Sequence, residues 1–182
     1  MPLLFETTTR AQRFTRTALL AAFGLVMFLF EAELPRPLPW AKPGLANIAT
    51  LLALYVLGAN GAWAVTLIRV FAGSLILGVF FSPGFGLSLA GGVCSCGVMI
   101  IMRRYCAQGF SVIGLSLAGA LAHVLAQMLC AALLIVRSST VVQLLPLMLW
   151  PALFTGFIVG LAAFLILERF ALLPETATKG LP

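Results

Sequence analysis

Long stretches of this chain carry no charged side chain, and this feature limits the possible folds more than any other. One stretch lies between Arg16 and Glu31, and a longer one lies between Arg137 and Glu168. A helix that spans a bilayer needs about 20 mostly apolar residues. Only 9% of the side chains are charged, whereas soluble domains carry about 25%. The sequence therefore excludes a water-soluble globule and predicts an all-α, polytopic membrane protein.

The apolar runs, with their Pro, Gly and charge boundaries, predict a bundle of six transmembrane helices in one integral membrane domain over residues 1–182. The first two are the shortest, at about 14 residues or ~21 Å. Six crossings fill the chain and leave no room for an appended catalytic domain. The expected helices cover residues 17–30, 45–58, 62–81, 87–102, 111–136 and 144–167.

The positions of the basic residues predict the orientation in the membrane. With six crossings both termini lie on one side, together with seven of the Lys and Arg residues: Arg10, Arg13, Arg16, Arg103, Arg104, Arg169 and Lys179. Only Arg36, Lys42 and Arg137 fall on the other side. The positive-inside rule then places both termini in the cytoplasm of a bacterial inner membrane, whereas five crossings would move one basic group outside. These residues form short groups at the ends of apolar runs, so we expect no nucleic-acid partner.

Missing residue types exclude several kinds of chemistry. The chain has five glutamates and no aspartate, so it cannot build the carboxylate cluster that holds Mg²⁺ in prenyl diphosphate condensing enzymes. No Gly-rich loop ends in the Lys-Ser or Lys-Thr pair that binds ATP phosphates. Cys94 and Cys96 lack the spacing and the second ligand pair of a zinc site. We therefore predict that the chain is not an enzyme and that it uses neither a metal nor a cofactor.

Residues 31–44 contain four prolines and are expected to form an outward-facing, semi-extended loop, because proline cannot continue a helix. Trp40 lies within this segment. Two interpretations are open. The loop closes over a pocket as a lid, or Trp40 anchors it at the depth of the lipid headgroups, where tryptophan is favoured.

Polar residues inside the predicted spans are the candidates for a binding site, because an unpaired charge there costs about 3 kcal/mol on insertion scales. Arg69 should face the bundle interior, where it either binds an anionic ligand or is satisfied by carbonyl groups or a glutamate. His123 and Gln127 lie one helical turn apart on one face, where they either line a pocket or join helices by hydrogen bonds. Asn47, at the start of the second span, either reaches the same site or caps its helix.

Small residues four positions apart mark faces where helices can approach closely. Such faces are usually internal to a fold. The pair in the first helix lies beside a basic end, so it is also a place where a partner protein could dock. The sets are Ala18 with Ala22, Gly114 with Ala118 and Ala122, and Gly156 with Gly160.

Several of these segments resemble the bacterial membrane family labelled both heptaprenyl diphosphate synthase component I and Gx transporter. The family commonly has His-Asn and Gly-Gln in its fifth helix, where this chain has His123-Val124 and Ala126-Gln127. The resemblance covers about residues 17–167. It lies in Pro43-Gly44-Leu45-Ala46-Asn47-Ile48, Arg69, Ser88-Leu89-Ala90-Gly91-Gly92, and His123 with Gln127.

Members of this family are similar to the substrate-binding S components of energy-coupling-factor (ECF) vitamin transporters. The resemblance implies six helices that hold a small vitamin-like molecule, with a separate transmembrane coupling protein and ATPase subunits as partners. It also implies that Ala18 and Ala22 form the AxxxA pattern that contacts the coupling protein. The alternative is a non-catalytic accessory subunit, associated with isoprenoid or quinone metabolism or with flavin-dependent electron export.

Overall fold

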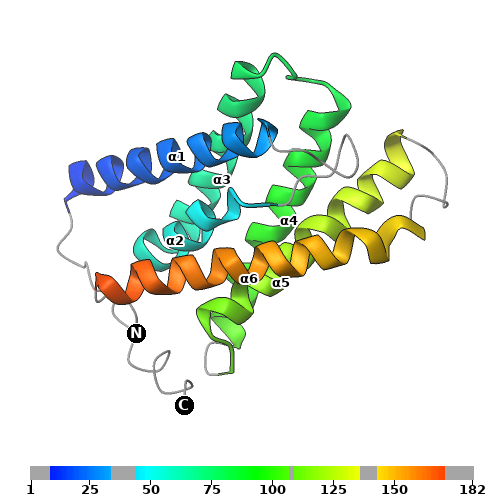
Figure 1. The fold of residues 1–182 in the computed structure, drawn as a ribbon. Helices are drawn as coiled ribbons and strands as arrows, with labels where there is room; N and C mark the ends of the chain where they lie inside the picture. Colours follow the sequence, from blue (N-terminus) through cyan, green and yellow to red (C-terminus); the bar gives the residue numbers. More distant parts are fainter. Residues whose placement is uncertain (1–8, 34–43, 107–108, 136–142, 171–182) are drawn as a thin grey trace.

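The computed structural model describes residues 9–33, 44–106, 109–135 and 143–170. Within these ranges the chain forms six α-helices and no β-strand, which confirms the predicted all-α class (Figure 1). A short π-helix, Ala131–Ile135, continues the fifth of them. The α-helices are α1 (Arg10–Glu33), α2 (Asn47–Leu57), α3 (Ala59–Ile76), α4 (Pro83–Tyr105), α5 (Val112–Cys130) and α6 (Leu145–Arg169).

Five of the described helices are long and apolar enough to cross a membrane, so the chain is a multi-pass membrane protein. The exception is α2, which has 11 residues. At ~1.5 Å per residue it is roughly 17 Å long, about half the thickness of a hydrocarbon core. It is therefore shorter than the span expected over residues 45–58.

The helix α1 extends beyond the expected range at both ends. It begins at Arg10 because Thr9 and Gln12 form a reciprocal capping box. The backbone N–H of Gln12 donates to Thr9 Oγ1 at 3.3 Å, and the backbone N–H of Thr9 donates to Gln12 Oε1 at 3.1 Å. It continues to Glu33, so Glu31 lies in a helix and not in the predicted loop.

The turn between α3 and α4 also differs from the expectation. We predicted a helix to residue 81, but α3 ends at Ile76, and Gly78 and Phe81 adopt left-handed backbone angles, with φ of 66° and 62°. The side chain of Ser82 then accepts a hydrogen bond from the Phe85 amide, and Pro83 begins α4. Proline fits the first helical position because no intrahelical hydrogen bond is lost there.

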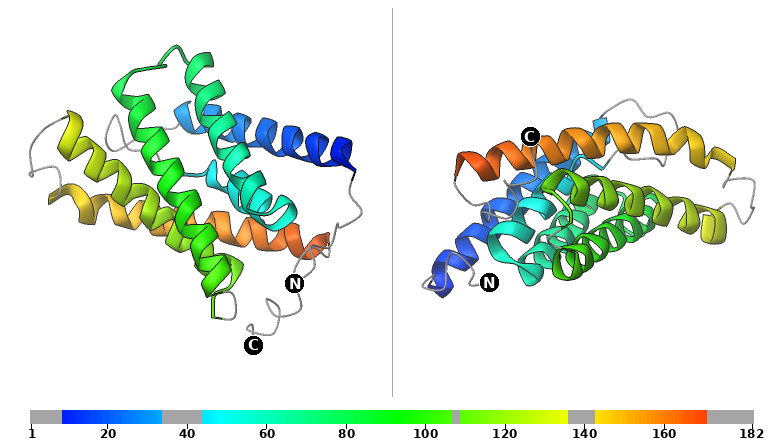
Figure 2. Two further views of the ribbon diagram at one scale, coloured as in Figure 1. Left: turned by 180° about the vertical axis from the view of Figure 1, so that it is seen from behind. Right: turned by 90° about the horizontal axis from the view of Figure 1, so that it is seen from below.

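Consecutive helices run antiparallel, as their contacts show. Along α2 and α3, Asn47 bonds to Arg69 while Thr50 bonds to Thr66, so the two helices progress in opposite directions. The first residue of α1 and the last of α6 accordingly lie at the same end of the bundle, as Figures 1 and 2 show.

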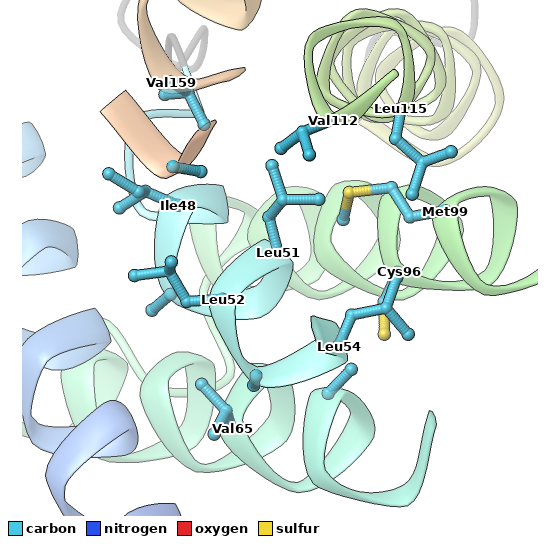
Figure 3. Packing of buried hydrophobic residues seen from close by; sticks show 14 of the residues in the cluster. Ile48, Leu51, Leu52, Leu54, Val65, Cys96, Met99, Val112, Leu115 and Val159 are labelled. Atoms are coloured by element: carbon cyan, nitrogen blue, oxygen red, sulfur yellow. The ribbon is translucent and has the colours of Figure 1, made fainter. Parts of the chain in front are cut away.

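The helix α2 lies at the centre of the packing and contacts each of the other five α-helices. Eight of its 11 residues are buried. In Figure 3, Leu51 lies close to Met99 of α4 and Val112 of α5, and all three are at most 1% exposed. The short helix is therefore enclosed by protein along most of its length.

Charged residues from two other helices bind the ends of α2. Glu31 of α1 accepts hydrogen bonds from the Gly44 and Leu45 amides just before the helix, and Arg103 of α4 donates to the Leu54 carbonyl. A helix leaves unpaired N–H groups at its start and unpaired carbonyls at its end, and these are costly away from water. The negative charge at the start and the positive charge at the end also match the helix dipole. These contacts explain how so short a helix is stable inside the bundle.

Candidate functional site

A chain of buried hydrogen bonds joins three helices at the start of α2. Nη2 of Arg69, on α3, donates to Oδ1 of Asn47 at 2.6 Å. Nδ2 of Asn47 in turn donates to Oγ of Ser95, on α4, at 3.0 Å. All three side chains are buried. Arg69 and Ser95 lie about halfway along their helices, so this polar cluster lies in the middle of the bundle.

Glycines on the neighbouring helices leave room for the arginine side chain. A Cβ atom on Gly24 of α1 would lie 3.3 Å from Cδ of Arg69, and one on Gly92 of α4 would lie 3.8 Å from its Nη2. The aliphatic part of the side chain therefore packs against α1, and the guanidinium reaches toward α4 and α2.

Glu31 provides the negative charge of the cluster. It is 2% exposed, and its carboxylate accepts a hydrogen bond from the Leu45 amide at 3.2 Å as well as the bond from Gly44. It also interacts electrostatically with Arg69. Arg69 and Glu31 therefore bring opposite charges to this part of the bundle.

His123 borders the same cluster from α5. A Cβ atom on Gly91 would lie 2.8 Å from Cε1 of His123 and 2.9 Å from both ring nitrogens, so the imidazole packs directly on the α4 backbone. A Cβ atom on Gly44 would lie 3.7 Å from Cδ2 of His123 and 3.5 Å from Nδ2 of Asn47. The histidine, the asparagine and the turn before α2 therefore meet at one place.

Two donor atoms of the site have no hydrogen-bond partner among the residues that the structure describes. They are Nε of Arg69 and Nε2 of Gln127, and the two side chains are 2% and 1% exposed. Most buried polar atoms in proteins have a partner, because an unsatisfied donor costs about 1–3 kcal/mol. Both atoms therefore keep unused hydrogen-bonding capacity within the described residues.

The structure brings together three of the five predicted binding residues, namely Asn47, Arg69 and His123. Gln127 is buried one turn from His123 on the same face of α5. Trp40 lies outside the described residues. Asn47 does not act as a cap, since Ala46 occupies that position and α2 has no side-chain cap.

The predicted partner-binding residues, Ala18 and Ala22, are exposed on α1. Gly156 and Gly160 are buried, by contrast, and a Cβ atom on either would lie 2.8 Å from an atom of α5. These two glycines lie where α6 packs against α5, whereas Ala18 and Ala22 lie on the exposed side of α1.

Sequence reasoning missed Glu31 and Ser95. Glu31 continues the buried stripe of α1, which includes Ala21, Gly24 and Phe28 at steps of three and four residues. That spacing could have identified Glu31 as an inward-facing side chain. Ser95 lies one turn after Gly91 on the same face of α4, but serine is common in membrane helices and offered no separate signal.

Comparison with known protein families identifies a match. The family described as heptaprenyl diphosphate synthase component I matches residues 20–166, a range that contains the whole polar cluster. No curated protein and no solved structure matches the chain. Because the matched range covers well over half of its length, the chain belongs to the heptaprenyl diphosphate synthase component I family.

Proposed function

We propose that this chain is the substrate-binding membrane subunit of an ECF-like uptake transporter, which captures a small, partly polar or anionic molecule such as a vitamin, a flavin or a precursor. The observation that carries the proposal is the buried guanidinium of Arg69, whose Nε has no partner in the described parts of the chain. A charged group at membrane depth is costly to keep, and such groups commonly mark a binding site or a transport path.

In this proposal Asn47, Arg69, His123 and Gln127 contact the captured molecule. Their support is the convergence of Asn47, Arg69 and His123 from α2, α3 and α5, with Gln127 buried one turn further along α5. Arg69 and Gln127 each keep an unused donor within the described residues. Trp40, which lies outside the described residues, is the fifth proposed contact, as predicted from the sequence. The chain itself binds and releases, and it carries out no covalent chemistry.

The partners in this proposal are a transmembrane coupling protein and ATPase subunits. The coupling protein docks on Ala18 and Ala22, because small exposed residues on a helix let another helix approach closely. The basic residues near the start of α1 favour a cytoplasmic location for that end, with both termini in the cytoplasm of a bacterial inner membrane. Transport then results from a change of bundle orientation that ATP hydrolysis drives.

The test is whether the isolated chain retains a small molecule. The protein is purified in mild detergent from its native membrane, denatured, and the released molecules are identified by mass spectrometry. We expect one compound at near-stoichiometric amount, and at least tenfold less of it with Arg69→Ala, since tenfold is ~1.4 kcal/mol of binding energy. An empty wild-type protein would contradict the proposal.

The family description favours a second candidate, an accessory membrane subunit that holds other components of heptaprenyl diphosphate or quinone synthesis together. In that case the exposed helix faces carry the function and the buried cluster only stabilises the bundle. The same purification distinguishes the two: an accessory subunit retains partner proteins but no small molecule.

A further inference from the structure

The charge balance of the buried cluster restricts which ligands fit. Among the described residues, Arg69 and Glu31 are the only buried side chains with a formal charge, and each is 2% exposed. The other titratable side chains nearby are His123 of α5 and Cys96 of α4, and neither adds to the formal charge, which counts histidine as neutral. The site therefore has a net charge of about zero before any ligand enters.

A ligand that brought its own negative charge to this depth would find no free counter-charge. Arg69 already interacts with Glu31, and the Glu31 carboxylate already occupies the Gly44 and Leu45 amides that would otherwise attract an anion. A second anion would be an uncompensated buried charge, which is strongly unfavourable. The Glu31 carboxylate thus already uses the positive charge and the amide donors that a ligand carboxylate or phosphate would need.

The unused groups indicate what the site does accept. Nε of Arg69 and Nε2 of Gln127 are both N–H donors, and both lack a partner within the described ranges. Donors of this kind are satisfied by oxygen or nitrogen acceptors, such as the carbonyl oxygen of an amide, a lactam or a heterocyclic ring. A site with zero net charge and unused donors should favour ligand groups that are neutral and carry a hydrogen-bond acceptor.

We propose that Glu31 is a specificity-determining residue that makes the site select an uncharged, carbonyl-bearing group and reject carboxylates. This inference rests on the proposed function and narrows its ligand class. Removing the charge of Glu31 should leave Arg69 uncompensated and favour anions. Removing the charge of Arg69 should leave Glu31 uncompensated and favour cations.

Three probes of nearly identical shape test the proposal: benzoate, benzamide and benzamidinium, which carry charges of about −1, 0 and +1 at neutral pH. Their apparent Kd values come from the concentration dependence of thermal stabilisation in detergent. We expect wild-type protein to prefer benzamide, Glu31→Gln to prefer benzoate, and Arg69→Gln to prefer benzamidinium, each by roughly tenfold or more.

Two further variants serve as controls. Glu33→Gln removes an exposed charge two residues further along α1 and should keep the wild-type preference. The double variant Glu31→Gln with Arg69→Gln is neutral again and should return to benzamide, which shows that the single variants act through charge and not through misfolding.

The outcomes separate this inference from the function on which it rests. A wild-type preference for benzoate, or an unchanged order of preference in Glu31→Gln, would overturn the role of Glu31 and leave substrate capture intact. If none of the probes stabilised any of the proteins, the role of Glu31 would be overturned, whereas the proposed function would fail only if the purified wild-type protein retained no small molecule.

Discussion

Arg69 and Asn47 are joined by a hydrogen bond of 2.6 Å that connects the middle of α3 to the first residue of α2. The side-chain nitrogen of Asn47 also donates to Ser95 of α4, so Asn47 bonds to two other helices. The asparagine therefore holds the start of a half-length helix at a fixed depth in the bundle. The remaining interactions of that helix can be tested one at a time.

Substituting Asn47 should destabilise the bundle more than substituting its partner Ser95. Asn47→Ala removes both hydrogen bonds and leaves Arg69 without its acceptor, so we expect a loss of about 1–3 kcal/mol in unfolding free energy. Ser95→Ala removes one acceptor and should cost about 0.5–1.5 kcal/mol. Thermal denaturation in detergent measures both, and equal effects would contradict a central role for Asn47.

The end of α2 provides a second prediction. The guanidinium of Arg103 lies 4.0 Å from the centre of the Tyr55 ring and donates to the Leu54 carbonyl. Arg103→Ala removes the cation–π contact and the partner of a terminal carbonyl, so we expect a loss of about 1–2 kcal/mol and faster hydrogen exchange near the end of α2. Arg104→Ala is the matched control, because Arg104 is exposed and its loss should change little. A similar effect of both variants would show that only overall charge matters.

The glycines of α4 allow a third test. Gly91→Ala places a methyl group 2.8 Å from Cε1 of His123 and forces the imidazole or the helix to move, so we expect about 1–3 kcal/mol of destabilisation and weaker retention of any bound molecule. Gly86→Ala lies in the same helix with no atom within 4 Å of the added carbon. It should stabilise the protein by about 0.5–1 kcal/mol, because alanine favours helices over glycine. Destabilisation at Gly86 and none at Gly91 would refute this packing.

The parts of the fold that depend on local composition could be predicted from the sequence, and those that depend on distant contacts could not. The burial of Arg69 and His123 followed from their position in apolar helices, since ionisable groups avoid lipid. The place where α2 starts inside the bundle depends on Glu31, which lies 13 residues before Gly44. The partners of Asn47 lie 22 and 48 residues away, so no local pattern indicates them.

Adjacent alanines on α1 distinguish the proposed partner surface from the core. Ala22 is exposed, so Ala22→Leu should leave the melting temperature nearly unchanged while reducing the amount of coupling protein that co-purifies from native membranes. Ala21 is 4% exposed and belongs to the main hydrophobic cluster, so Ala21→Leu should overpack it and cost about 1–3 kcal/mol. The two residues are neighbours with the same side chain, so a difference between the two variants reflects only the direction in which each side chain points. Undiminished co-purification with Ala22→Leu in a stably folded protein would remove this face from the proposed partner interface.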